Sequence, residues 1–372
     1  MIRYCKTCVL PDSRPNVTLD ENGVCNGSTF RQKEKINWDE RKKEFEKIVK
    51  KVKSKKTQYN CVIPVSGGKD STWQVIKALE YDLNPLCVTW KTPGRSKLGH
   101  SNLNNLINLG VDHIDFTTNP SVEKLFTLKA FKKFGNPLIP MHMAMHAIPL
   151  QIAVNFNIPL ILWGENSAFE YGGDDKLMGD TLDHKWLKKY GVTNGTSYKD
   201  WIDNDITKDC LSAYQWPSQE QQKMAGLKAV FMGYFFKWDP LTTYKIAKNH
   251  GFISAKTPKT GFYNYADIDD SFLITIHHWM KWYKFGFTRI WDNLSIEIRQ
   301  GRMSREEAIE IIKKQGEENP IKEIKLFCNY LEITQNEFFE IASGFRNLEI
   351  WDVNERGIWY IKNFLIDGWV WQ

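Results

Sequence analysis

Val65-Ser-Gly-Gly-Lys-Asp-Ser71 is the stretch that decides the fold. The apolar run at residues 59–65 leads into it and predicts a buried strand, and a helical pattern of apolar residues follows it. Gly67 and Gly68 let the backbone approach an anion closely, and the first N–H groups of a helix point toward such an anion. The stretch therefore predicts a phosphate-binding turn between a strand and a helix.

The side chains of this turn indicate a nucleotide bound together with Mg²⁺. Ser66 and Ser71 offer hydroxyl donors, and Lys69 offers a positive charge. Asp70 would repel a phosphate unless a divalent cation lay between them. The spacing is not that of the Walker loop. An alternative is a plain glycine turn in which Asp70 and Ser71 only cap the helix. The combination of all six residues from Ser66 to Ser71 at a strand–helix boundary favours the nucleotide site.

Composition places the chain among ordinary globular proteins. Of its 372 residues 42% are hydrophobic and 25% are charged, and no apolar run is long enough to span a membrane. The first residues lack the pattern of a signal peptide, and seven unevenly spaced cysteines do not suggest a disulfide framework, so we expect a reducing cytoplasm. The net charge of +6 arises in residues 31–56, which hold twelve basic and five acidic residues. The rest of the chain is close to neutral, which argues against a broad RNA-binding face.

Residues 1–30 are rich in cysteine and turns and predict a zinc-ribbon-like element. Cys5 and Cys8 form one close pair, and sixteen residues further on Cys25 and Ser28 occupy the places of a second pair. Serine is a poor zinc ligand. Two alternatives therefore stay open: Zn²⁺ held by three thiolates plus water or a borrowed histidine, or a lost site.

Residues 31–56 predict a basic amphipathic helix. Phe45, Val49 and Val52 recur on one face at helical spacing. A solvated helix packed on the next domain is the favoured interpretation, and a docking face for a partner or nucleic acid is the alternative.

Residues 57–271 form the predicted nucleotide-binding domain. Strands alternate with helices up to about residue 170, which predicts an α/β fold with a doubly wound parallel sheet and ligands at the carboxyl ends of its strands. The predicted strands are residues 59–65, 84–90, 111–117 and 158–164. Residues 174–235 are expected to be a helical insertion, and residues 272–372 a region that is helical to its end.

Two strand ends should bring further residues to the nucleotide site. Thr89 and Trp90 end the second strand, where an adenine could lie. A glycine- and carboxylate-containing segment follows the fourth strand and is a candidate for substrate or Mg²⁺ contacts, although a helix-capping turn would also explain it. Its residues of interest are Gly164, Glu165, Asn166, Glu170 and Tyr171.

Two other groups of polar residues have two interpretations each. His142 and His146 share one face of a predicted helix, as two metal ligands would, but a packed helix that lines a substrate pocket is favoured. Residues 256–271 place lysines and aspartates around a glycine turn, which either reach the rim of the active site or form a surface loop.

The central stretch resembles the PP-loop of the ATP pyrophosphatases. That superfamily, with its adenine nucleotide alpha hydrolase-like fold, cuts ATP between the α and β phosphates and activates a carbonyl oxygen as its adenylate. The nucleophile that then displaces AMP is usually ammonia or a persulfide sulfur. Cys61 and Cys87 are predicted to lie inside strands, so the sequence favours ammonia. Cys25 also matches a glutaminase elbow, which we reject because no buried strand precedes it.

Five stretches together resemble the N-acetyl sugar amidotransferases, and the likeness spans nearly the whole chain. They are Cys5–Pro15, Asn22–Gly27, Ser66–Ser71, Trp163–Gly173 and Ile298–Ala308. The resemblance implies a bacterial enzyme of lipopolysaccharide, O-antigen or nonulosonic-acid synthesis that converts a sugar acetamido group into an acetamidino group. It also implies a nucleotide-sugar substrate and a partner resembling the glutaminase pair of histidine biosynthesis. Family members usually have a fourth cysteine at the place of Ser28, which puts the zinc site in doubt.

The same resemblance assigns roles by position. Ser66, Gly67, Gly68, Lys69, Asp70 and Ser71 would bind ATP phosphates and Mg²⁺, with Lys69, Asp70 and Glu165 in catalytic roles. Asn166, Glu170, Tyr171, His142 and His146 would line the sugar end. No sequence argument identifies a general base. The alternatives are a PP-loop tRNA thiolation enzyme and a non-catalytic nucleotide-binding scaffold.

Overall fold

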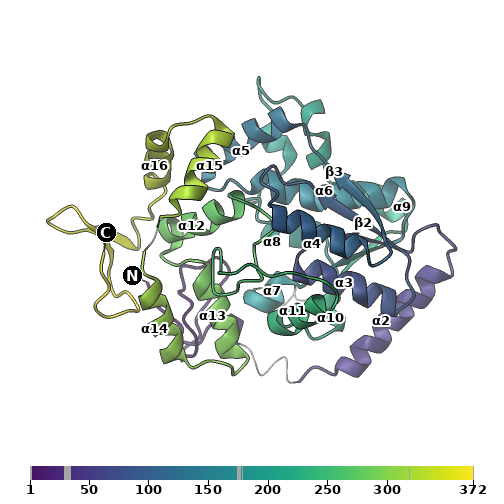
Figure 1. The fold of residues 1–372 in the computed structure, drawn as a ribbon, viewed down its shortest axis with the longest axis horizontal. Helices are drawn as coiled ribbons and strands as arrows, with labels where there is room; N and C mark the ends of the chain where they lie inside the picture. The colour runs from purple at the N-terminus through teal and green to yellow at the C-terminus, as the bar shows by residue number, and fades with distance from the viewer. Residues whose placement is uncertain (1, 29–34, 174–176, 178, 318, 372) are drawn as a thin grey trace.

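A five-stranded parallel sheet forms the centre of the molecule (Figure 1). The computed structural model describes residues 2–28, 35–173, 177, 179–317 and 319–371. The strand order is β3-β2-β1-β4-β5. The strands are β1 (Cys61–Pro64), β2 (Pro85–Trp90), β3 (Asp112–Phe116), β4 (Leu160–Trp163) and β5 (Lys228–Phe231). The predicted doubly wound parallel sheet is confirmed, and its four predicted strands are present within a few residues of their expected bounds.

The fifth strand corrects the sequence analysis. β5 lies within residues 174–235, which were expected to be a helical insertion, and it pairs in parallel with β4. Its four residues are too few to show a period that would separate a strand from a helix.

Helices cover both faces of the sheet, and alternate residues of each strand point to opposite faces. Val62 and Ile161 pack against α5 (Pro120–Phe134) and α6 (Ile139–Asn155). Ile63 and Leu162 pack on the other side, in a cluster with α3 (Lys69–Glu80) and α4 (Lys97–Ile107). The chain thus forms three layers around the predicted nucleotide-binding edge.

Helix α2 (Trp38–Lys53) confirms the favoured interpretation of the basic segment, of which residues 31–34 lie outside the described part. Phe45 is fully buried and contacts the rings of Tyr81, Phe235 and Phe236. The apolar face of α2 is therefore covered by the α/β domain.

Shorter elements connect these parts. The described short helices are η1 (Asn26–Ser28), α7 (Ser167–Tyr171), α8 (His184–Tyr190), η3 (Tyr198–Trp201), η4 (Asp209–Tyr214), α9 (Gln219–Met224) and α10 (Met232–Phe235), and the longer α11 (Pro240–Asn249) packs against α3. Among the described helices none has the length and apolar character that crossing a bilayer requires.

The C-terminal region is helical only in its first part. Its helices are α12 (Leu273–Phe285), α13 (Arg289–Arg299), α14 (Arg305–Gln315), α15 (Ile321–Leu331) and α16 (Gln335–Ser343). Contrary to the expectation of helix to the end, the antiparallel hairpin of β6 (Trp351–Val353) and β7 (Trp359–Ile361) follows. Gly357 has a φ of +76° in the turn between the two strands, a value that suits glycine.

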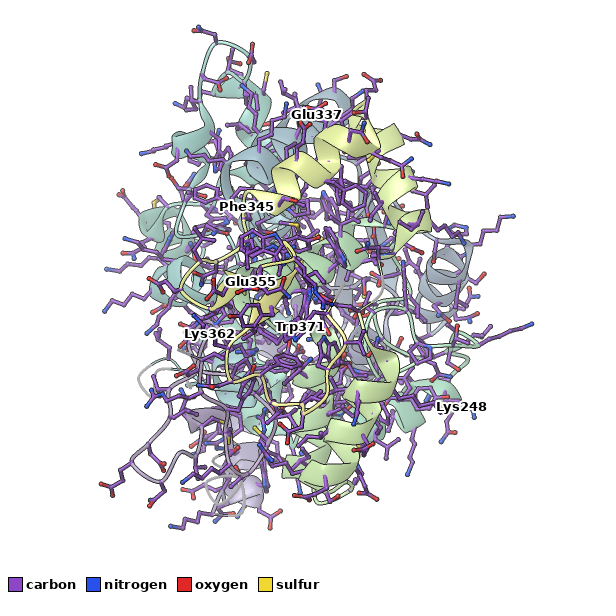
Figure 2. All side chains as sticks on the ribbon, turned by 90° about the vertical axis from the view of Figure 1, so that its left-hand side faces the viewer. Lys248, Glu337, Phe345, Glu355, Lys362 and Trp371 are labelled. Atoms are coloured by element: carbon purple, nitrogen blue, oxygen red, sulfur yellow. The ribbon has the colours of Figure 1, made fainter. Side chains whose placement is uncertain are left out.

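The hairpin packs where the two chain ends meet. Ile2, Trp282, Trp351 and Ile361 form one buried cluster. Figure 1 shows both termini on the left-hand side, and Figure 2 views that side, with Trp371 among the side chains of the C-terminal segment and Glu355 and Lys362 nearby.

Candidate active site

The turn between β1 and α3 has the geometry of an anion-binding loop. Gly67 has a φ of +82°, and a Cβ atom at this position would lie 2.5 Å from the backbone nitrogen of Leu103, so only glycine fits. Gly68 is the N-cap of α3 and donates its N–H to Ser66 Oγ at 3.2 Å. Ser71 Oγ donates to the Gly68 carbonyl oxygen at 3.0 Å. These contacts hold the loop at the helix N-terminus, where partial positive charge favours phosphate.

Asp70 is fixed by residues that lie far away in the sequence. Its Oδ1 accepts hydrogen bonds from Trp238 Nε1 and from Thr243 Oγ1, both at 3.0 Å, and its Oδ2 pairs with Lys69 Nζ at 2.5 Å. Sequence reasoning did not find Trp238 or Thr243, because no local motif marks them. The carboxylate is thus oriented before any ligand binds.

A cavity of about 480 Å³ opens in front of this loop. The structure brings the ends of β1, β2 and β4 to its wall, as parallel strands require. Among the predicted site residues, those that line it are Ser66, Gly68, Lys69, Asp70, Ser71, Thr89, Trp90, His142, His146, Gly164, Glu165 and Tyr171.

Asn166 and Glu170, which were predicted to contact substrate, are not among the described residues that line the cavity. They lie four residues apart at helix α7 and share the face that turns away, whereas Ser167 and Tyr171 share the face toward the cavity. Asn166 is buried and structural, since its Oδ1 accepts from Trp186 Nε1 at 3.0 Å and its Nδ2 donates to the Leu177 carbonyl oxygen at 2.9 Å.

Two carboxyl groups on the cavity wall hold protons unusually tightly. Burial, together with the negative charge of Asp70, raises the pKa of Glu165 to about 7. Burial, together with the charge of Asp270, raises the pKa of Asp269 to about 6. Both groups therefore exchange protons close to neutral pH, which suits acid–base chemistry or binding of a cation.

The two predicted histidines are neutral at pH 7, because burial lowers the pKa of each to about 4. His142 Nδ1 donates to the Leu138 carbonyl oxygen at 2.9 Å, and His146 Nδ1 donates to the His142 carbonyl oxygen at 2.7 Å. The Nε2 atom of each ring is then an acceptor. This arrangement fits the favoured interpretation of a pocket-lining helix.

Residues 256–271 reach the active-site rim, which decides between the two interpretations of that segment. Asp267, Asp269 and Asp270 all line the cavity. Ser96 fixes the segment, because its backbone N–H donates to the Asp269 carbonyl oxygen at 2.9 Å. Gly99 allows the close approach, since a Cβ atom there would lie 2.6 Å from Asp269 Cα.

A buried ion cluster lies behind the cavity wall and was not expected from the sequence. Asp292 is 0% exposed, and its carboxylate meets Arg14 Nε at 2.7 Å, Lys281 Nζ at 3.1 Å and Arg289 Nη1 at 3.9 Å. The Tyr171 ring lies near both guanidinium groups, with its centre 5.4 Å from that of Arg14 and 5.8 Å from that of Arg289. The cluster joins the N-terminal element to α12, α13 and the cavity.

The three N-terminal cysteines form a candidate metal centre. The Sγ atoms of Cys5, Cys8 and Cys25 are buried and lie within 4.8 Å of one another. The backbone N–H groups of Cys8 and Cys25 donate to Cys5 Sγ at 3.4 and 3.2 Å. Ser28 Oγ lies 3.0 Å from Cys25 Sγ and 3.7 Å from Cys5 Sγ, in the fourth place. The donor set fits Zn²⁺, because Zn–S bonds of about 2.3 Å in a tetrahedron bring the sulfurs close together.

The three-cysteine centre lies outside the cavity wall and holds the N-terminal element against α14. None of these cysteines is among the described residues that line the cavity. Arg305 Nε donates to the carbonyl oxygens of Cys5 and Cys8 at 3.3 and 3.0 Å, which ties the element to α14.

Comparison with known proteins gives one family match. The model of the LPS biosynthesis protein WbpG-like, C-terminal domain, matches residues 259–365. No curated protein matches the chain. Among solved structures, the chain is similar to the NMN synthetase from Francisella tularensis, at 17% identity over 60% of this chain and 99% of that one, with a TM-score of 0.26. The region matched by the family model supplies Asp267, Asp269, Asp270 and Arg289 to the cavity wall.

Proposed function

We propose that the protein is an ATP-dependent amidotransferase that converts the acetamido group of an N-acetylated sugar, carried as a sugar nucleotide, into an acetamidino group, with release of AMP and pyrophosphate. The observation that carries this proposal is the Ser66–Ser71 turn at a helix N-terminus, with Asp70 and Glu165 facing one cavity. The family match to a lipopolysaccharide-biosynthesis domain supports a sugar substrate.

The charges around the cavity suit a nucleotide bound with Mg²⁺. The described wall carries five carboxyl groups against three basic side chains. Asp70 is the residue that would hold the ion, with phosphate oxygens completing its shell. Bound there, Mg²⁺ would offset the negative charge of the phosphates.

The other end of the cavity offers suitable contacts for a sugar. Trp163 and Trp186 present aromatic surface beside the neutral imidazole of His146. The Nε2 acceptors of His142 and His146 can receive hydrogen bonds from sugar hydroxyl groups.

The reaction has two steps. First, the acetamido oxygen attacks the α phosphorus, the bond from that phosphorus to the bridging oxygen breaks, and pyrophosphate leaves with the electron pair. Next, ammonia attacks the activated carbon, the carbon–oxygen bond breaks, and AMP leaves with the former acetamido oxygen. Glu165 would accept the proton that the attacking nitrogen loses, a role that its pKa near neutrality supports.

Ammonia fits this cavity better than a protein-bound sulfur. No cysteine is present among the described residues of the cavity wall. Cys61 and Cys87 are buried in their strands, and burial raises the pKa of the Cys87 thiol to about 12 and that of Cys61 well above its ordinary value. We therefore propose that ammonia comes from solvent or from a glutaminase partner.

The test is incubation of the full chain with acetamido-sugar nucleotides, ATP, Mg²⁺ and ammonium, followed by mass spectrometry. We expect a product lighter by the exchange of oxygen for an NH group. If the acetamido oxygen carries a heavy isotope, the label should appear in AMP. AMP formation that needs tRNA and sulfide, or an absence of ATP turnover with every acetamido sugar, would overturn the proposal in favour of a thiolation enzyme or a nucleotide-binding scaffold.

A further inference from the structure

Arg289 is the cavity-lining cation that is least engaged by the protein itself. Among the described residues of the wall three side chains carry a permanent positive charge: Lys69, Arg95 and Arg289. Lys69 Nζ pairs with Asp70 Oδ2 at 2.5 Å. Arg95 forms a bidentate ion pair with Asp115, in which Nη1 and Nη2 donate to the two carboxylate oxygens at 2.5 and 2.7 Å.

The ion pairs of Arg289 are much longer. Its Nε lies 3.7 Å from Asp267 Oδ2, and its Nη1 lies 3.9 Å from Asp292 Oδ2. Its Nε is buried and has no hydrogen-bond partner among the described residues. A buried N–H group without a partner is unfavourable, so this position indicates a ligand that the protein is built to receive.

The surroundings do not neutralise this guanidinium group. Asp292 already accepts a hydrogen bond from Arg14 at 2.7 Å and one from Lys281 at 3.1 Å. Asp267 accepts a hydrogen bond from Thr260 at 2.6 Å and lies 3.6 Å from His278 Nε2. Two carboxylates thus serve three partly buried cations, and Arg289 has the longest contacts of the three.

Backbone conformation supports a site built for function at this place. Asp267 has a φ of +55°, in the left-handed region, which aspartate adopts more readily than most residues but which is still uncommon. Such conformations are found at functional sites, where the surrounding structure holds them. Arg289 itself is the first residue of α13, beside helix α7 (Figure 1), so a regular element fixes its position.

We infer that Arg289 is a catalytic residue that binds phosphate oxygens of ATP opposite the PP-loop and stabilises pyrophosphate as it leaves. This inference rests on the proposed function. Asp70 engages the Lys69 ammonium, so Lys69 is not a free side-chain cation for the charge that develops when the bond to the α phosphorus breaks. A guanidinium group presents a planar pair of N–H donors that matches two phosphate oxygens.

Direct binding measurements test this role without any sugar. Isothermal titration calorimetry of the Arg289→Gln and Arg289→Lys chains uses Mg²⁺-ATP, Mg²⁺-pyrophosphate and adenosine as ligands. We expect Arg289→Gln to weaken ATP and pyrophosphate about 10- to 100-fold, with adenosine unchanged and with partial recovery in Arg289→Lys. Adenosine serves as the internal control, because it needs the folded nucleoside site and has no phosphate. Arg356→Gln, an exposed arginine in the C-terminal hairpin, is the matched surface control.

Two outcomes overturn the inference. One is unchanged affinity for ATP and pyrophosphate in Arg289→Gln. The other is a higher KM for the sugar with unchanged ATP affinity, which would mean that Arg289 contacts the second substrate. If the wild-type chain forms no amidine, the proposed function fails, but the affinities for ATP and pyrophosphate still decide the role of Arg289.

Discussion

Replacing Asp292 by asparagine should destabilise the protein strongly. Asp292 has no exposed surface, and its carboxylate is the shared partner of Arg14, Lys281 and Arg289. Asparagine keeps the shape but removes the charge, so three partly buried cations lose their common counter-ion. Removing one partner of a buried pair typically costs about 3–5 kcal/mol, and we expect the free energy of unfolding to fall by about that amount.

The pH dependence has a defined sign. Burial opposes ionisation of Asp292, but Arg14, Lys281 and Arg289 outweigh it and hold the pKa of this carboxyl well below its usual range. The stabilisation is therefore complete above the unfolded carboxyl pKa of about 3.9 and is lost as the pH falls through the lower folded pKa. The stability of the Asp292→Asn chain should lack this acid-dependent component.

Urea denaturation at pH 7, with tryptophan fluorescence as the signal, measures the effect. Asp352→Asn is the control, because Asp352 pairs with Lys362 at the exposed surface and should change stability by less than about 1 kcal/mol. Adding Arg14→Gln to Asp292→Asn should restore part of the loss, because one unpaired cation is removed. A loss of less than about 1 kcal/mol in Asp292→Asn would refute the view that this carboxylate neutralises the cluster.

Three further predictions concern the nucleotide site and the cysteine element. Asp70→Ala and Ser66→Ala should each lower pyrophosphate release at least about 100-fold, with an unchanged circular dichroism spectrum, and near-normal turnover in both would contradict the site assignment. Activity of the wild-type chain should rise through about pH 7 as Glu165 ionises, because the ionised carboxylate is the form that accepts a proton, and Glu165→Gln should show a low and flat pH profile. Ser28→Cys should raise the zinc content measured by atomic absorption toward one ion per chain, because a thiolate is the better ligand, and an unchanged content would show that the three cysteines are held without zinc.

The edge of the sheet that carries the candidate site could be predicted because its signals are local. A strand, a glycine turn and a helix are adjacent in the sequence, and parallel strands must end at one edge, so Thr89, Glu165 and the Ser66–Ser71 turn had to lie near one another. Contacts between distant segments leave no such pattern. Trp238 is 168 positions from the Asp70 that it fixes.

Errors at the site and in the fold have equally physical causes. Glu165, Asn166, Glu170 and Tyr171 follow the same strand, but the turn of α7 sends Asn166 and Glu170 to the inner face. The polar side chains of Asn166 and Glu170 suggested contact with substrate, but the face of α7 on which they lie buries them away from the cavity. The four-residue strand β5 and the C-terminal hairpin were missed because short apolar runs do not distinguish strand from helix.

The cavity joins two parts of the chain that the sequence analysis had treated separately. The sheet edge supplies the anion-binding turn and Glu165, while residues 259–289 supply another part of the wall with Asp267, Asp269 and Arg289. Behind that part, Arg14 of the N-terminal element is joined to it through Asp292. Since a phosphate-binding turn alone cannot select an acceptor or balance the charge of departing pyrophosphate, the C-terminal region is the part of the structure in which those two properties should be sought. Variants on that wall, rather than further changes in the turn, will therefore separate the choice of substrate from the use of ATP.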